Sequence, residues 1–493
     1  MEAEILSWLG LVLSYVVVFG LLGLSTILKT RFKLSEYLTR KIVHIGVSNW
    51  WFIAVLMMED TLLASFGPIT FIILNYLSYR FEIFKGMETK EKSNLGTVYF
   101  PISLLLLVLL SYSGIIPKAA AGIGILVMGY ADGMAAIAGK KFGRYWFDFS
   151  PNKSLEGSLT FAVIAFGVSF VYLLVGPSIQ VSFLSALLFA FLIGLSGMLI
   201  EIVTPVGLDN LSVPILTAFA VHTLALGDYR LVLAILVNFI IAAAAFRKKA
   251  VSSSGFIAGI TVGTVIFLSS LVAYFMLMAF FITSSVMSKI GKSKKRAAMS
   301  VAEKGHRRDY LQVLANSIVG VITTLLFALT GNSLFLIATA ICFATANADT
   351  WASEVGNLSS KNPVSIMSFK RIRRGLSGGV TLLGTAASLL GSMVIATVFL
   401  VVSRDLFADN ALSVFFLVTL AGFFGGVLDS LLGATIQVKY VSSQGEVFEK
   451  EPKYLDSQNY QRKGWSIISN DMVNLITSAI AVPFFSVLYL LIR

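Results

Sequence analysis

Residues 129–143 read GYADGMAAIAGKKFG, an apolar, glycine-rich stretch that is interrupted by Asp132 and followed by basic residues. A carboxylate inside an apolar run is costly at membrane depth and usually has a function there. The second half of the chain carries a similar stretch, ANADTWASEVG at 346–356, in which Asp349 takes the place of Asp132. An acidic residue in an apolar helix, present twice, is therefore the starting point for predicting fold and function.

Three further signatures follow each of these stretches in the same order. The first half continues with NKSLEGS, GLSGMLIE and LDNLSVPI, and the second with RGLSGG, GFFGGVLD and SNDMVNLI. The order predicts two related active sites on one polypeptide. The aligned pairs are Asp132 with Asp349, Leu155-Glu156-Gly157 with Leu376-Ser377-Gly378, Glu201 with Asp429, and Asp209-Asn210 with Asn470-Asp471.

The composition indicates a polytopic membrane protein. The 493 residues are 57% hydrophobic and only 13% charged, whereas soluble proteins carry about a quarter charged residues. Apolar runs of about 20 residues, the length of a membrane-spanning helix, recur along the chain. We predict an all-α fold with sixteen spans, at 5–28, 42–58, 61–79, 97–113, 118–138, 158–175, 182–203, 211–226, 229–246, 254–268, 270–287, 311–330, 334–349, 379–402, 412–432 and 470–491.

The basic residues predict an orientation. The net charge is +12, from 38 Lys and Arg against 26 Asp and Glu. Lys and Arg gather in alternate loops, such as 139–153 and 361–374, and the loops between these are short and nearly free of them. Because basic loops mark the cytoplasmic side, we expect every acidic signature at the cytoplasmic face. Basic charge placed between membrane spans argues against a nucleic-acid partner.

A boundary between two domains is predicted near residue 250. Arg247, Lys248 and Lys249 end one apolar run, and a serine-rich segment opens the next. This predicts membrane domains at 1–250 and 251–493, arranged as a parallel repeat because aligned spans run in the same direction.

The lone Cys342 lies inside an apolar run, which argues against disulfides and against a cysteine metal site. The oligomeric state stays open.

The first half combines carboxylates with a basic, glycine-rich loop. A carboxylate beside cations suits Mg²⁺ held against a phosphate chain, with the cations on phosphate oxygens. The helix predicted to open after Lys153 adds an anion site at its N-terminal amides. The candidate catalytic residues are Asp132, Lys153, Glu156, Glu201 and Asp209, of which Asp132 and Asp209 are candidate metal ligands. The candidate nucleotide- and phosphate-binding residues are Asn94, Lys140, Lys141 and Asn210.

Several of these residues also fit purely structural roles. Lys140 and Lys141 suit the ordinary positive charge of a cytoplasmic loop. Asp209 suits the start of the helix that follows it. Asp132 and Glu201 are harder to explain in this way, because each interrupts or closes an apolar helix.

Residues 35–245 resemble the phytol kinase and dolichol kinase family, which is related to phosphatidate cytidylyltransferases. The resemblance rests on RKIVH, NLGTVYFP, ADGMAAIAGKKFG, NKSLEGS and EIVTPVGLDNLSVPI occurring in this order. The family transfers a phosphoryl group from CTP to an isoprenoid alcohol. The resemblance therefore implies CTP and Mg²⁺ near Asp132, Lys153, Glu156 and Asp209.

The second half carries a denser polar set. Asn347, Thr350 and Glu354 share one helix face because of their spacing, and Asp429 and Gln437 share another. Interhelical hydrogen bonding would account for some of the amides, but poorly for three separated acidic sites. The candidate catalytic residues are Asp349, Glu354, Asp429 and Asp471, with Asp349 and Asp429 as metal ligands. The candidate nucleotide- and phosphate-binding residues are Arg308, Asn316, Arg374, Gly378 and Asn470.

Residues 252–490 resemble a family of membrane proteins that includes plant phytyl-phosphate kinase. The matching motifs include SSSGFIAGITVGT, RRDYLQVLAN, ANADTWASEVG, RRGLSGGVTLLGT and GVLDSLLGATIQ. We interpret the polar segment 439–465 as a mobile cytoplasmic loop.

Together the two resemblances imply an isoprenoid alcohol kinase followed by an isoprenoid monophosphate kinase. Such a protein would use CTP or another nucleoside triphosphate, with Mg²⁺, on an alcohol such as phytol, geranylgeraniol or farnesol, as part of lipid metabolism. Phosphoryl transfer needs metal, phosphate-binding cations and a positioned acceptor, and each half offers all three. The alternatives are a lipid cytidylyltransferase, in which CMP is transferred, and a transporter or flippase for a polyprenyl phosphate.

Overall fold

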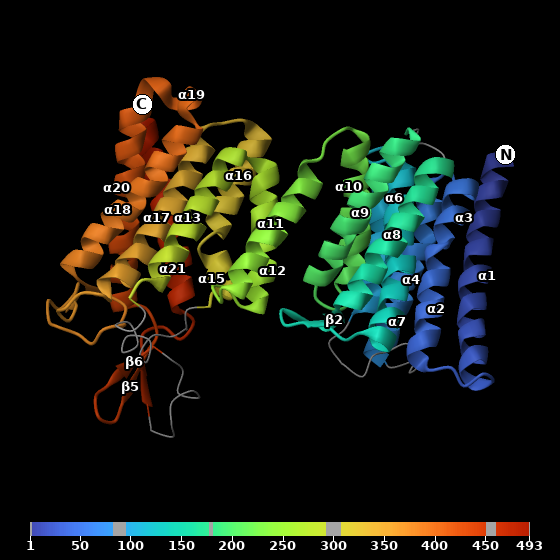
Figure 1. Cartoon of the computed structure of the whole chain (residues 1–493), viewed down its shortest axis with the longest axis horizontal. Helices are drawn as coiled ribbons and strands as arrows, with labels where there is room; N and C mark the ends of the chain where they lie inside the picture. The colour runs from blue at the N-terminus through green and yellow to red at the C-terminus, as the bar shows by residue number, and fades with distance from the viewer. Residues whose placement is uncertain (1, 82–94, 177–180, 292–306, 450–459, 493) are drawn as a thin grey trace. The chain divides into compact units, whose positions relative to one another are not determined.

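The computed structural model describes residues 2–81, 95–176, 181–291, 307–449 and 460–492. The chain divides into two compact units, Met1–Phe239 (unit 1) and Ile240–Arg493 (unit 2). Figure 1 shows that each unit is built mainly of helices. The division falls inside the helix Arg230–Arg247, and the predicted domain boundary near residue 250 lies beyond its end.

Unit 1 is a helical bundle with one short antiparallel strand pair. Its elements are α1 (Glu2–Thr30), α2 (Glu36–Ser48), α3 (Trp50–Met57), α4 (Thr61–Phe81), α5 (Gly96–Tyr112), α6 (Lys118–Leu126), the π-helical η1 (Val127–Asp132), α7 (Gly133–Phe142), β1 (Trp146–Phe147), β2 (Ser150–Ser154), α8 (Leu155–Val175), α9 (Phe183–Val203), α10 (Asp209–Ala225) and the first part of α11 (Arg230–Arg247).

Unit 2 contains helices, a two-stranded sheet and a three-stranded sheet. Its elements are the rest of α11, then α12 (Ser253–Ser269), α13 (Leu271–Lys289), α15 (Tyr310–Ala315), α16 (Ile318–Thr330), α17 (Leu334–Gly356), β3 (Val364–Ser365), β4 (Gly379–Val380), α18 (Leu382–Val402), α19 (Arg404–Phe407), η2 (Ala408–Asn410), α20 (Ala411–Thr435), β5 (Lys439–Ser442), β6 (Val447–Phe448), β7 (Tyr460–Lys463) and α21 (Asn470–Ile492).

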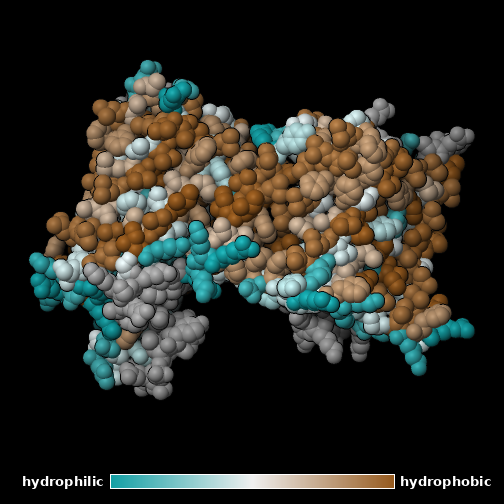
Figure 2. Space-filling view, viewed as in Figure 1, coloured by the Kyte–Doolittle hydropathy of each residue, from teal (hydrophilic) through white to brown (hydrophobic). Residues whose placement is uncertain are grey.

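The helices have the lengths and surfaces of membrane spans. Among the described residues, eleven helices are long and apolar enough to cross a membrane, and three more are apolar but shorter. Hydrophobic residues cover the sides of the helices in each unit, and hydrophilic residues gather toward the helix ends (Figure 2). An all-α polytopic membrane protein therefore fits the structure, and the full count of sixteen spans stays a prediction.

Two predicted spans are wrong as single helices. The span predicted at 42–58 is divided at Asn49 into α2 and α3. The span predicted at 311–330 is divided into α15 and α16, because the Asn316 side chain donates to the carbonyl of Gln312 and α15 ends there. Hydropathy reports burial along a segment and cannot detect such breaks in backbone direction.

One helix forms the centre of each unit. In unit 1 the span Lys118–Phe142, made of α6, η1 and α7, is 78% buried over its apolar window, and in unit 2 α17 is 72% buried. A helix that is apolar all round belongs in a core. In unit 1 the central span packs against α8 and α10, and in unit 2 α17 packs against α18, α20 and α21. Asp132 and Asp349 therefore lie on the central helices.

Close glycine contacts join each central helix to the next long helix. A Cβ placed on Gly157 would lie 3.0 Å from the carbonyl oxygen of Ala135 and 3.2 Å from the Cα of Gly139. These distances leave no room for a side chain, so the backbones of α7 and α8 touch. Small residues permit such close packing of membrane helices.

Unit 2 repeats this contact with different residues. A Cβ on Gly384 would lie 2.8 Å from the carbonyl oxygen of Ala352 and 3.2 Å from the Cα of Gly356. The helix caps match as well, since Thr381 accepts a hydrogen bond from Gly384 N just as Ser154 accepts one from Gly157 N. Ser154–Gly157 and Thr381–Gly384 therefore make similar local contacts, and the predicted pairing of Leu155-Glu156-Gly157 with Leu376-Ser377-Gly378 stays a prediction.

The segment predicted as a mobile loop at 439–465 contains a sheet. β5 pairs antiparallel with both β6 and β7, and all three strands lie within this segment. β5 and β6 extend beyond the helix ends of unit 2 (Figure 1). Residues 450–459 lie outside the described part of the chain. The prediction failed because alternating polar and apolar residues in so short a strand give a weak periodic signal.

Candidate active site

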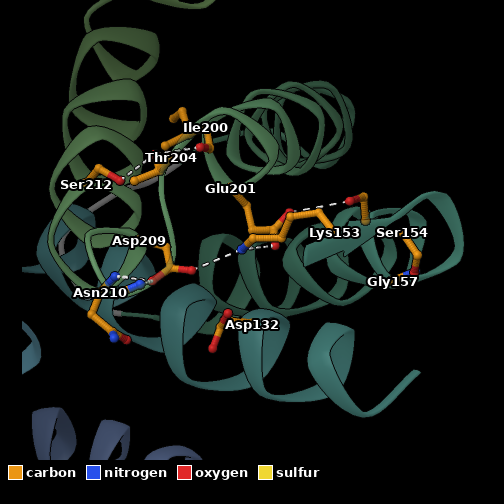
Figure 3. A network of polar contacts seen from close by, with 12 residues as sticks. Asp132, Lys153, Ser154, Gly157, Ile200, Glu201, Thr204, Asp209, Asn210 and Ser212 are labelled. Atoms are coloured by element: carbon orange, nitrogen blue, oxygen red, sulfur yellow. Dashed lines mark hydrogen bonds and ion pairs between the residues drawn. The ribbon is translucent and has the colours of Figure 1, made fainter. Parts of the chain in front are cut away.

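Lys153 is the centre of a buried charge cluster in unit 1. Its ammonium binds the carboxylate of Glu201 and lies 3.0 Å from Oδ2 of Asp209. The three side chains come from β2, the C-terminal end of α9 and the first turn of α10, and they point toward one another in Figure 3. Buried charges persist when they are paired in this way. Glu201 and Asp209, both candidate catalytic residues from the sequence, therefore lie together around Lys153.

The local sequence explains how Lys153 reaches this position. β1 and β2 form a short antiparallel pair, which carries the chain from the end of α7 to the start of α8. Ser154 then caps α8, so Lys153 is the last residue before the cap. Burial alone would lower the pKa of Lys153, but the charges of Glu201 and Asp209 outweigh burial and raise it above its ordinary value. Lys153 therefore stays a cation.

Asp132 adds a second ion pair beside this cluster. Its Oδ2 lies 2.6 Å from the ammonium of Lys41 and 3.9 Å from Nε2 of His44, both on α2. Asp132 also interacts electrostatically with Lys153 and projects from its helix beside the cluster in Figure 3. It ends the π-helical turn η1, and such turns are frequent at functional sites because they re-aim side chains.

Lys41 is a residue that sequence reasoning missed. It belongs to the RKIVH motif, but the sequence alone did not distinguish it from the other basic residues of its loop. Its position one turn before His44 places both on one helix face, and this spacing was the available signal. The result is a set of three carboxylates and two ammonium groups in one buried region.

The other predicted residues of unit 1 lie around this region. The Glu156 carboxylate accepts the backbone N–H of Tyr145 at 3.4 Å. Lys140 lies over the ring of Tyr37 and Lys141 over the ring of Phe142, and both lysines are exposed. The remaining predicted residues are Asn210, whose backbone N–H donates to Asp209 Oδ1 at 3.1 Å, and Asn94, which lies outside the described residues.

In unit 2, Asp349 and Asp429 lie together. Their side chains interact directly across the contact between α17 and α20. Asp429 is 8% exposed, and its Oδ2 is buried without a hydrogen-bond partner in the part of the chain that the structure describes. Asp349 is half-buried. Two adjacent carboxylates that are largely shielded from water repel each other unless they share a proton or bind a cation.

The polar face of α17 contacts α13. Thr283 donates to Oδ1 of Asn347 at 3.0 Å, and Ser288 donates to Glu354 at 2.6 Å. The predicted shared face of Asn347 and Glu354 is therefore confirmed. Arg308 lies nearby, where its guanidinium donates to the Ser284 hydroxyl at 2.9 Å and interacts electrostatically with Glu354.

The glycine-rich loop of unit 2 is held by residues that sequence reasoning missed. Glu449 accepts the backbone N–H of Ser377 at 2.6 Å and its hydroxyl at 3.1 Å. Lys439 donates to the Ser377 carbonyl at 3.0 Å. Both residues come from the segment predicted as a mobile loop, so no periodic signal identified them. Gly378 adopts φ +86°, which favours glycine.

The remaining predicted residues of unit 2 have local contacts. Arg374 donates to the carbonyl of Ser360 at 2.8 Å, and the Asn316 amide ends α15. Asn470 and Asp471 lie in the first turn of α21, where Asp471 is buried. The roles predicted for these residues stay predictions.

The carboxylates of each unit form small donor sets for a cation. Among the described residues, no group of three or more His, Cys, Asp or Glu side chains is placed to hold a metal ion. Mg²⁺ usually takes only one or two carboxylates and completes its shell with water and substrate phosphates. The pair Asp349 and Asp429 fits this pattern, because Asp429 Oδ2 has no described partner. In unit 1, the pair Asp132 and Asp209 fits this pattern of metal ligands when the ammonium groups of Lys41 and Lys153 move from the carboxylate oxygens to phosphate oxygens.

Two family models match the chain, one in each half. The integral membrane protein family DUF92 matches residues 236–482. The chain belongs to this family. The cytidylyltransferase family matches residues 4–204. This DUF92 protein therefore joins a phytol kinase-like half to a DUF92 half, as the motifs predicted.

Individual relatives agree with this division of the DUF92 protein. It is 32% identical to Protein PGR of Arabidopsis thaliana over 51% of this chain and 93% of the relative. It is 34% identical to the phytol kinase of Synechocystis sp. over 42% of this chain and 86% of the relative. Protein VTE6, chloroplastic, of Arabidopsis thaliana is 28% identical over 46% of this chain and 61% of the relative. No solved structure matches the chain.

Proposed function

We propose that this chain is a two-step kinase for isoprenoid alcohols. Unit 1 converts a prenyl alcohol to its monophosphate, and unit 2 converts the monophosphate to the diphosphate. The observation that carries the proposal is the Lys153 cluster, because it combines buried carboxylates and ammonium groups in the half whose motifs resemble phytol kinases. The similarity to the phytol kinase of Synechocystis sp. supports the first step.

In the first step, the alcohol oxygen attacks the γ-phosphorus of CTP. The bond from that phosphorus to the bridging oxygen breaks, CDP leaves, and Glu201 accepts the hydroxyl proton. Lys41 and Lys153 stabilise the charge on the phosphate oxygens, as preorganised cations do in phosphoryl transfer. Asp132 and Asp209 would hold Mg²⁺, which would supply further neutralisation of the phosphate charge. The prenyl tail lies among the apolar helices.

The second step repeats this chemistry on a phosphate acceptor. An oxygen of the prenyl monophosphate attacks the γ-phosphorus of a second nucleotide, and a nucleoside diphosphate leaves. Asp349 and Asp429 hold the metal in unit 2. Arg308, Arg374 and the Gly378 loop bind phosphate oxygens, with Asn316 and Asn470 beside them, while Glu354 and Asp471 complete the acidic set. The resemblance of residues 252–490 to a family that includes phytyl-phosphate kinase supports this step.

We place both sites at the cytoplasmic face of the membrane, because Lys and Arg gather in the loops that join the site helices. We also propose that the two units are a parallel repeat with domains near 1–250 and 251–493. The matching glycine contacts, Gly139 with Gly157 and Gly356 with Gly384, support this repeat.

A direct assay tests the two steps. The purified chain is incubated with Mg²⁺, with CTP, UTP, ATP or GTP, and with labelled phytol, geranylgeraniol or farnesol, and the lipid products are separated. Asp132→Asn is expected to slow phosphorylation of the alcohol ~100-fold or more and to leave phosphorylation of added monophosphate intact. Asp349→Asn is expected to do the reverse, so that monophosphate accumulates.

The matched control is Asp405→Asn, because Asp405 is exposed on α19 and paired only with Arg404. It is expected to leave both steps unchanged. Loss of both steps in either single variant, with the protein still folded, would contradict two separate sites and indicate one composite site.

A second candidate function is cytidylyl transfer to a lipid phosphate. The match of residues 4–204 to the cytidylyltransferase family favours it. The assay separates the two chemistries by their products, because a kinase releases CDP whereas a cytidylyltransferase releases diphosphate and a CMP-bearing lipid. If neither product forms and labelled polyprenyl phosphate crosses a vesicle membrane, the result would indicate a transporter.

A further inference from the structure

Gln437 carries an unsatisfied buried amide in unit 2. The residue follows α20 and is only 2% exposed. Its Nε2 and Oε1 are both buried without a hydrogen-bond partner among the described residues. Buried polar groups are nearly always hydrogen-bonded, so this amide requires an explanation.

The amide lies just past the end of α20, near the proposed metal ligand. Asp429 and Gly433 are one turn apart on α20, and a Cβ placed on Gly433 would lie 3.3 Å from Oε1 of Gln437. Asp429 Oδ2 is also without a described partner. Gly433 therefore has the unpaired amide beside it and the unpaired carboxylate one helical turn before it.

The glycine-rich loop packs directly against α20 at Gly433. A Cβ placed on Gly433 would lie 2.8 Å from the Cβ of Ser377 and 3.3 Å from Oε1 of Gln437. Ser377 is held there by Glu449 and Lys439, which come from the sheet. A ligand that reaches the amide must therefore pass the Ser377 loop.

We propose that the Gln437 amide recognises the base of the nucleotide bound in unit 2. A glutamine amide offers one acceptor and one donor in a plane, and it pairs with a base edge that presents a donor beside an acceptor. Cytosine and adenine have such an edge, formed by an amino group next to a ring nitrogen. With the base at Gln437, the phosphates extend toward Asp429, and the Ser377 loop, which packs on Gly433, moves aside to admit the nucleotide. This inference rests on the proposed kinase activity of unit 2.

The test uses the full chain and the second step alone. The KM for CTP is measured during phosphorylation of added prenyl monophosphate. The Ki of inorganic triphosphate, a competitor that lacks the base, is measured in the same assay. Gln437→Met is expected to raise the KM for CTP about 10-fold or more, because a bidentate base contact is lost. The Ki of inorganic triphosphate should stay unchanged.

Two further variants separate recognition from a structural role. Gln461→Met changes an exposed glutamine on β7 and is expected to leave both constants unchanged. Gln437→Asn keeps an amide and is expected to fall between wild type and Gln437→Met. It also provides the measurement if the Met variant does not fold.

The outcomes are distinct. If the ratio of the KM for CTP to the Ki of inorganic triphosphate does not change in folded Gln437 variants, the inference is overturned. That result indicates that the amide binds only buried water. A parallel rise of both constants also overturns it, because that result reports a distorted site rather than a lost base contact. If wild-type protein phosphorylates no prenyl monophosphate with any nucleotide, the proposed function of unit 2 fails first.

Discussion

Each unit places a carboxylate on its central helix, but the two units neutralise their carboxylates differently. In unit 1, Asp132 pairs with Lys41, and Glu201 and Asp209 pair with Lys153. In unit 2, Asp349 and Asp429 face each other. When Ser154 is matched to Thr381 as the helix cap, the position of Lys153 is taken by Val380. Unit 1 therefore contains its own cations, whereas the aspartates of unit 2 require a proton or a bound cation.

This difference shows that similar helical bundles can carry sites of different charge. An internal ammonium lets a carboxylate stay ionised in a buried region without a ligand. A carboxylate pair without one binds a divalent cation more readily, because no internal cation competes for the oxygens. We expect the thermal midpoint to change in opposite directions when a single charge is removed from one site or from the other.

The largest effect is expected from Lys153→Met. This change leaves Glu201 and Asp209 buried without their common partner, and breaking a buried pair costs about 3–5 kcal/mol. The thermal midpoint in detergent should fall, and phosphorylation of the alcohol should be lost while that of the monophosphate persists. Lys248→Met is the control, because Lys248 is exposed and belongs to neither candidate site. An unchanged midpoint would show that the cluster is not formed in solution.

A smaller and opposite pair of effects is expected at the aspartates. Asp132→Asn removes the partner of Lys41 and should destabilise the protein by about 1.5–3 kcal/mol, the range for hydrogen bonds to charged groups. Asp429→Asn relieves repulsion with Asp349 and should leave the midpoint in EDTA unchanged or raise it. Both midpoints are measured by thermal unfolding with EDTA and again with Mg²⁺ and CTP.

Ligand linkage sharpens this comparison. Mg²⁺ with CTP should raise the wild-type midpoint more than either alone, because a ligand that binds only the folded state stabilises it. The rise should be smaller in Asp429→Asn. If the rise is equal in wild type and in Asp429→Asn, unit 2 does not bind the metal through Asp429.

The smallest effect is expected at the glycine contacts. Gly157→Ala and Gly384→Ala each place a Cβ against the backbone of the central helix, and overpacking of this kind costs about 1–3 kcal/mol. The two changes should lower the midpoint by similar amounts if the units are a repeat. Gly167→Ala and Gly259→Ala are the controls, because no atom lies within 4 Å of either added Cβ. A cost at only one of the two contacts would argue against the repeat.

Much of the architecture was predictable from the sequence. The helices α1, α4, α5, α8 and α9 lie close to their predicted ranges, because long apolar runs identify spans by composition alone. The order of the acidic signatures indicated that Glu201 and Asp209 belong to one site and that Asp349 belongs with Asp429. Both relations rest on residue type and order, which a sequence carries directly.

The pairing of charges was decided by the tertiary structure. Lys41 lies 91 residues before Asp132, and so large a sequence separation does not indicate that the two side chains pair. Glu449 and Lys439 reach Ser377 only because β5 and β6 fold back on the helix ends. Such contacts depend on the directions of several elements at once.

Hydropathy and residue order alone indicate a helical membrane protein with two acidic sets in two halves, because both are local properties of the sequence. The tertiary structure added the Gly139–Gly157 and Gly356–Gly384 contacts, because each joins residues of different helices. It also decided which carboxylates have a lysine partner. Ion pairing is set by distance in space, and sequence separation does not encode that distance.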